Sequence, residues 1–122
     1  MSEPGERHFG ALRGATTIDH DDPIHVREAT RELLERLIAD NNIAPGDIIS
    51  VVFTVSNDIA SEFPARAARD LGWVDVPLLC ATEIPVRGAV PHCIRVLIHL
   101  ESSRPRHELR SVYLRGAARL RD

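Results

Sequence analysis

The run Cys93-Ile94-Arg95-Val96-Leu97-Ile98 predicts a buried strand over residues 94–100, because aliphatic and β-branched side chains favour the pleated surface of a sheet. A single arginine stands inside this run. A guanidinium group in an apolar segment costs free energy unless an anion meets it. Arg95 therefore indicates a small anionic ligand beside the predicted strand.

A second stretch, Leu79-Cys80-Ala81-Thr82-Glu83, sets a thiol and a carboxylate three residues apart, just after an apolar run. We interpret it, together with Arg95, as half of the anionic-ligand site. Arg13, near the front of the chain, and Tyr113, near its end, would complete that site. All fifteen basic residues are arginine. Lysine chemistry such as a Schiff base is therefore excluded, and any anion must be held by guanidinium groups, which bind carboxylates in a bidentate manner.

The composition is that of an ordinary globular protein. At 122 residues the chain is expected to form one domain, residues 1–122, with enough length to bury a core. The net charge of −3 argues against a nucleic-acid partner. The first residues are polar and no long apolar stretch follows them, so we expect no signal peptide, no membrane segment and a cytoplasmic location.

Cysteine and histidine spacing gives no pattern typical of a metal site. Cys80 and Cys93 form no CxxC motif, and the six histidines include no HExxH pair. This spacing therefore predicts no metal site.

Local patterns predict the remaining elements. Asp22 can cap a helix that starts at Pro23 and repeats apolar residues at three- and four-residue spacing to about residue 41. The β-branched residues 48–55 predict another buried strand. The other expected elements are strands at 8–15, 76–80 and 111–114, a helix at 65–71, a helical turn at 105–110, a flexible N-terminus at 1–7 and a C-terminal tail at 116–122. This order predicts an α/β (α+β) fold, a mixed β-sheet with helices on one face.

Two residues constrain the backbone further. Pro77 lies near the start of its predicted strand, which indicates a position at a sheet edge, because proline cannot donate a ladder hydrogen bond. Gly14 follows Arg13 and allows either a bend or the close approach of a ligand.

Seven short segments, spread in a fixed order over about residues 8–121, carry a family resemblance. They are Leu12-Arg13-Gly14-Ala15-Thr16-Thr17, Phe63-Pro64-Ala65-Arg66-Ala67-Ala68-Arg69, Gly72-Trp73, Val76-Pro77, Cys80-Ala81-Thr82-Glu83, Cys93-Ile94-Arg95-Val96 and Val112-Tyr113-Leu114. Together they resemble the monofunctional chorismate mutases of the AroH class. The resemblance implies a homotrimer with a pseudo-α/β-barrel arrangement and active sites between adjacent subunits. It also implies conversion of chorismate to prephenate, on the route to phenylalanine and tyrosine, without a cofactor.

The resemblance assigns roles to individual residues. Arg13 and Arg95 take the two guanidinium positions. Cys80 and Glu83 are expected near the ring hydroxyl of the substrate, and Tyr113 is expected to contact a carboxylate. The expected pocket wall consists of Phe63, Ala65, Leu78 and Leu79. Arg69 is expected at the entrance of the pocket, and Arg66 stands where the family has a lysine, so the positive charge is kept. Leu120 and Arg121 are expected in a C-terminal segment that closes over the site.

The implied reaction is an intramolecular Claisen rearrangement, which needs no nucleophile and no covalent intermediate. Arg95 is then expected to stabilise the negative charge that grows on the ether oxygen, while the other groups hold the substrate in its reactive form. Cys80 has no nucleophilic part in this hypothesis. The alternative is a non-enzymatic trimeric module that binds small anionic metabolites in the same cleft. Glu83 favours the enzyme, because a binder of carboxylates does not need a carboxylate of its own.

Overall fold

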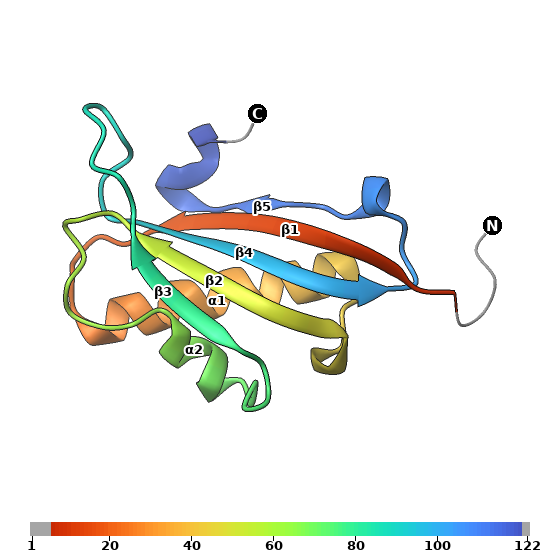
Figure 1. The fold of residues 1–122 in the computed structure, drawn as a ribbon. Helices are drawn as coiled ribbons and strands as arrows, with labels where there is room; N and C mark the ends of the chain where they lie inside the picture. The colour runs from red at the N-terminus through yellow and green to blue at the C-terminus, as the bar shows by residue number, and fades with distance from the viewer. Residues whose placement is uncertain (1–5, 121–122) are drawn as a thin grey trace.

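Five strands form one mixed sheet, and two helices lie against one of its faces (Figure 1). The structure is a computed structural model, and it describes residues 6–120. The strands are β1 (His8–Thr17), β2 (Ile48–Val55), β3 (Leu78–Thr82), β4 (Cys93–Ser102) and β5 (Val112–Tyr113). The helices are α1 (Pro23–Asn41) and α2 (Ala65–Asp70), with 3-10 turns η1 (Pro45–Asp47), η2 (Arg106–Glu108) and η3 (Arg115–Leu120). The predicted α+β fold with helices on one face is confirmed.

The strand order is β3-β2-β4-β1-β5, with β4 at the centre. β4 pairs antiparallel with both β1 and β2, whereas β3 lies parallel to β2 and β5 parallel to β1. The central place of β4 explains its apolar sequence. β3 is an edge strand, as Pro77 predicted, but it begins two residues later than expected, because Pro77 has no N–H to donate and contributes only its carbonyl, which accepts from Val51 at 3.0 Å.

The long helix starts and ends where the sequence predicted. The carboxylate of Asp22 accepts a hydrogen bond from the backbone N–H of His25 at 2.8 Å, and Pro23 occupies the first turn. Asn42 adopts a left-handed conformation, φ 52°, and its N–H bonds the carbonyl of Ile38. The buried side chains of α1 are Val26, Ala29, Thr30, Leu33, Leu34, Leu37 and Asn41.

Gly14 permits α1 to lie close to the sheet. A Cβ at this position would stand 2.9 Å from Cδ1 of Leu37 and 3.1 Å from Cδ1 of Leu33. The helix therefore makes the close approach that glycine allows on this side of the sheet.

Near both ends of the described chain, side chains and backbone groups bond to the rest of the fold. Arg7 donates to Asp47 at 2.6 Å and to the carbonyl of Glu101 at 2.8 Å. η3 replaces the loose tail expected from residue 116 onward: Ala117 is buried, and the N–H of Gly116 donates to Oγ1 of Thr17 at 3.0 Å. Residues 1–5 and 121–122 of the expected flexible ends lie outside the described residues.

The face of the sheet opposite α1 and α2 has no helix against it, and we call it the open face. Its side chains include Phe9, Arg13, Val52, Thr54, Leu79, Arg95, Leu97 and Tyr113. Phe9 and Leu79 are 52% and 63% exposed there. The connection from β3 to β4 and the segment η3 both rise on this side (Figure 1). No helix within residues 6–120 has the length and apolar character needed to cross a membrane.

Candidate active site

Two neighbouring rows of side chains cross the open face, because the strand registers bring them into line. One row runs through Thr54, Arg95, Ala15 and Tyr113, on β2, β4, β1 and β5. The next row runs through Leu79, Val52, Leu97 and Arg13, on β3, β2, β4 and β1. Side chains two residues apart on a strand share a face, so both guanidinium groups point to the same side of the sheet.

A cavity of about 380 Å³ lies over these rows, and we call it the central cavity. Its lining residues are Arg13, Gly14, Ala15, Val52, Thr54, Glu83, Arg95, Val96, Leu97, Tyr113 and Leu120. The volume is in the range of small-molecule sites. Segments far apart in the sequence thus bring five of the predicted site residues together, Arg13, Glu83, Arg95, Tyr113 and Leu120.

An ion pair marks the charged part of the central cavity. Nε of Arg95 lies 3.8 Å from Oε2 of Glu83, and both side chains are partly exposed. The backbone N–H of Glu83 donates to the carbonyl of Val55 at 2.8 Å, which fixes this residue just beyond the end of β3. The hydroxyl of Thr54 donates to the same Oε2. The cavity therefore presents two guanidinium groups and one oriented carboxylate to a ligand.

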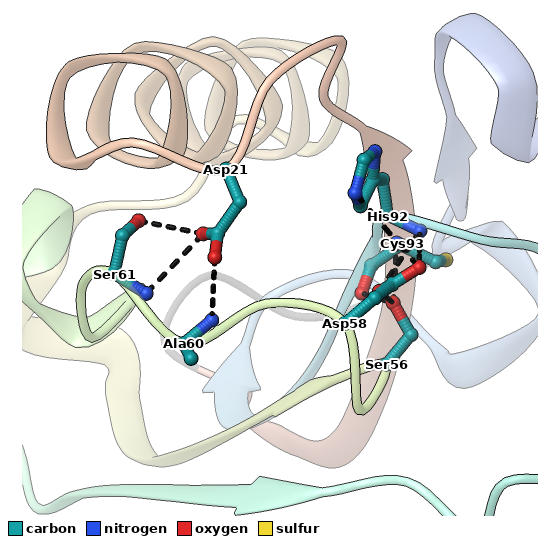
Figure 2. A network of polar contacts seen from close by, with 7 residues as sticks. All are labelled: Asp21, Ser56, Asp58, Ala60, Ser61, His92 and Cys93. Atoms are coloured by element: carbon teal, nitrogen blue, oxygen red, sulfur yellow. Dashed lines mark hydrogen bonds and ion pairs between the residues drawn. The ribbon is translucent and has the colours of Figure 1, made fainter.

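A polar network holds the start of β4, two residues before Arg95 (Figure 2). Ser56 accepts the N–H of Cys93 at 2.8 Å, and Asp58 accepts the N–H of His92 at 3.0 Å. Burial alone would raise the pKa of Asp58, but hydrogen bonds from the Ser56 hydroxyl and the His92 amide outweigh it and lower that pKa. The ionised carboxylate thus stabilises the bend at His92, whose φ is 49°.

Other predicted site residues line a second, separate depression of about 270 Å³, which we call the edge hollow. Phe63 and Cys80 contribute to it, and Phe63 is 70% exposed. Cys80 pairs with Phe53, so its side chain lies on the helix side of β3, opposite to the face that carries Arg95. Within one chain, Cys80 and Glu83 therefore line different depressions.

The remaining predicted residues within the described part of the chain line neither depression. Ala65 and Leu78 are partly buried against the core, Leu79 is exposed on the open face, and Arg66 and Arg69 are exposed on α2. Arg121 lies outside the described residues. Four further residues on the open face were not predicted from the sequence to belong to the site: Thr54, Val52, Ala15 and Leu97. The two-residue alternation along β1, β2 and β4 was the signal that could have placed them on one face.

Both cysteines are protonated thiols at neutral pH. Burial raises the pKa of Cys80, against the effect of a hydrogen bond from the backbone of Ala65. Burial also raises the pKa of Cys93, although the guanidinium of Arg95 acts in the opposite direction. Because the thiolate is the nucleophilic form, neither side chain is activated for covalent chemistry.

Comparisons with known proteins show which family the chain is similar to. A family model described as chorismate mutase type I matches residues 9–122. The chorismate mutase AroH of Thermus thermophilus is 46% identical over 111 residues, covering 90% of this chain and 91% of that protein. The chorismate mutase AroH of Bacillus subtilis (strain 168) is 36% identical over 111 residues, covering 90% and 87%.

A solved chorismate mutase from Clostridium thermocellum has the same fold, with a TM-score of 0.86 and 39% identity over 88% of this chain and 96% of that one. These findings confirm the family resemblance. They support an enzyme and give no support to the alternative of a non-enzymatic binding module. The chain belongs to the chorismate mutase type I family.

Proposed function

We propose that the central cavity is the site at which this isomerase rearranges chorismate to prephenate, a step of aromatic amino acid biosynthesis. One observation carries the proposal. Arg13, Glu83, Arg95 and Tyr113 come from four different parts of the chain and line one cavity of small-molecule size. A dianionic substrate needs at least two cationic contacts, and the two guanidinium groups supply them.

The rearrangement breaks one carbon–oxygen bond while it forms one carbon–carbon bond, and no proton is transferred. Negative charge grows on the ether oxygen as the bond to it breaks. In the proposal, Arg95 donates to that oxygen, and Arg13 with the Tyr113 hydroxyl holds a carboxylate. Glu83 accepts a hydrogen bond from the ring hydroxyl and lies near the developing positive charge. Electrostatic stabilisation and restraint of the substrate together lower the barrier.

The proposal includes a homotrimer whose active sites form between adjacent subunits. Two features of the single chain support it. The predicted site residues divide between the central cavity and the edge hollow, so one chain alone does not gather them. The open face leaves Phe9 and Leu79 exposed, and apolar side chains gathered on one face are typical of a surface that another subunit covers. In the trimer, the edge hollow around Phe63 would complete the neighbouring subunit's central cavity, and Leu120, which lines the central cavity, would close over the bound substrate.

A direct assay tests the proposal. Purified protein is mixed with chorismate in the presence of a chelator, the loss of chorismate absorbance is followed, and acid converts the product prephenate to phenylpyruvate. Arg95→Ala should lower kcat/KM by roughly 10²–10³-fold, and Arg95→Lys should lose much of the same rate, because lysine lacks the planar fork. Near-normal turnover by a folded Arg95→Ala protein would contradict the assignment. The cytoplasmic location stays a prediction, which cell fractionation would check.

A further inference from the structure

Among the polar side chains that line the central cavity in the described residues, Thr54 is the one without a role in the proposed mechanism. It stands on β2 between two neighbours, since it pairs with Ala81 of β3 and with Arg95 of β4. Its hydroxyl donates to Oε2 of Glu83, and Nε of Arg95 approaches the same oxygen at 3.8 Å. The same carboxylate oxygen thus accepts a hydrogen bond from the hydroxyl and forms an ion pair with the guanidinium group.

Glu83 needs such a restraint more than the arginines do. It lies one residue past the end of β3, next to an exposed connection that includes Ile84 and Val86. Its backbone is fixed by the hydrogen bond to Val55, but its side chain is about one-third exposed and has several rotatable bonds. The Arg95 contact at 3.8 Å is longer than a hydrogen bond, so it attracts the carboxylate without setting its direction.

The other oxygen of the same carboxylate is available. Within residues 6–120, Oε1 of Glu83 has no hydrogen-bond or ion-pair partner, whereas Oε2 has two. A carboxylate held through one oxygen offers the second one in a fixed direction, which lowers the entropy lost when a ligand hydroxyl binds there.

We propose that Thr54 is a positioning residue: its hydroxyl holds Oε2 of Glu83, so that Oε1 is directed at the hydroxyl group of the substrate in the central cavity. The inference rests on the function proposed above. The competing explanation is that Thr54 is only a β-branched residue suited to a strand. In that case valine would serve equally well, because it has the same shape and a high strand propensity.

Two substitutions separate these explanations. Thr54→Val removes the hydroxyl and keeps the shape, and we expect kcat/KM to fall roughly tenfold, mainly through kcat, with the melting temperature within a few degrees of the parent. Thr54→Ser keeps the hydroxyl, and its kcat/KM should stay within about twofold of the parent. Equal activity of the valine variant and the parent would overturn the inference.

A double-mutant cycle shows whether Thr54 acts through Glu83. In a Glu83→Ala background, Thr54→Val should cost less than about twofold, because the group it positions is gone. A tenfold loss in both backgrounds would overturn the inference, since Thr54 would then act by another route. If Glu83→Ala alone leaves turnover unchanged, the proposed function of the site fails. If Glu83→Ala is strongly impaired while Thr54→Val is not, only the inference about Thr54 fails.

Discussion

Cys80 is the residue whose chemistry could compete most directly with an electrostatic mechanism. It lies in the edge hollow, and burial raises the pKa of its thiol, so the reactive thiolate is scarce at neutral pH. We therefore expect Cys80→Ala and Cys80→Ser to keep kcat/KM within roughly tenfold of the parent, because they change only packing at the wall. The chorismate assay measures both variants. Complete loss of turnover in both folded variants would indicate thiol chemistry instead.

At the scale of single residues, the sequence predicted the charged groups of the site but not their arrangement. Taken one at a time, Arg13, Arg95 and Tyr113 could each be an ordinary strand or surface residue. Only the ordered set of seven segments that resembles the family indicated that they belong to one site. The three-residue spacing of Cys80 and Glu83 suggested a shared position. Along an extended chain, however, residues three apart point to opposite faces, and Cys80 and Glu83 line different depressions. Thr54 was not predicted as a site residue, because threonine is common in strands and so gives no separate signal.

At the scale of elements, the turn between β1 and α1 is tied to the connection that follows β2. Asp21 accepts hydrogen bonds from the Ser61 hydroxyl at 2.6 Å and from the N–H groups of Ala60 and Ser61 (Figure 2). The hydrogen bond from the Ser61 hydroxyl, with those from the two N–H groups, lowers the pKa of Asp21 despite the opposing effect of burial. The contact therefore stabilises the folded protein most when this carboxylate is ionised.

We expect Asp21→Ala to lower the melting temperature by roughly 5 °C at pH 7. Because the folded-state pKa is below the ordinary value, the stabilisation is present above about pH 4 and is lost as the pH falls through the folded-state pKa. The difference between variant and parent should therefore narrow in acid, as followed by thermal unfolding at several pH values. Asp19→Ala is the matched control, since Asp19 has no hydrogen bond or ion pair within residues 6–120. A difference that stays constant down to pH 2.5 would contradict the role of the ionised carboxylate.

The elements with strong local signals were predicted closely, and those that depend on tertiary contacts were not. α1 carries its own cap and periodicity, and β2 is a continuous β-branched run, so their predicted bounds hold. η3 has no such signal. It is held by burial of Ala117 and by the contact of Gly116 with Thr17, which lies almost a hundred residues earlier in the chain. No local pattern could reveal that contact.

At the scale of the whole molecule, the strand order could not be predicted from local sequence patterns, because β1 pairs with β4, a strand far from it in the sequence. That pairing decides which side chains share the open face, and so it decides the site. Within one chain the central cavity lies on the open face, whereas Cys80 of the edge hollow lies on the helix side of β3. In the proposed trimer, a site completed by both depressions pairs two subunits that present different surfaces to each other, as in a closed ring.

Mixed trimers test this arrangement directly. Arg95→Ala damages the central cavity, and a Phe63→Ala/Arg69→Ala double variant damages the surface around the edge hollow; we expect each alone to lose at least about tenfold in kcat/KM. When the two are co-expressed and the trimers that contain both kinds of subunit are purified, one of the three sites in each trimer pairs an intact cavity with an intact edge hollow, so about a third of the parent activity should return. The assay is the turnover of purified mixed trimers carrying two different tags.

Co-expression of Arg95→Ala with Glu83→Ala is the control for this experiment. Both changes lie in the central cavity, so every mixed site keeps one of them and no activity should return. Recovery in the first mixture and not in the second requires that the two depressions belong to different subunits of one site. Equal recovery in both mixtures, or none in a first mixture shown by sedimentation to be trimeric, would contradict a site shared between subunits. In that case the central cavity alone would have to hold chorismate, and Phe63 and Arg69 would have no contact with it.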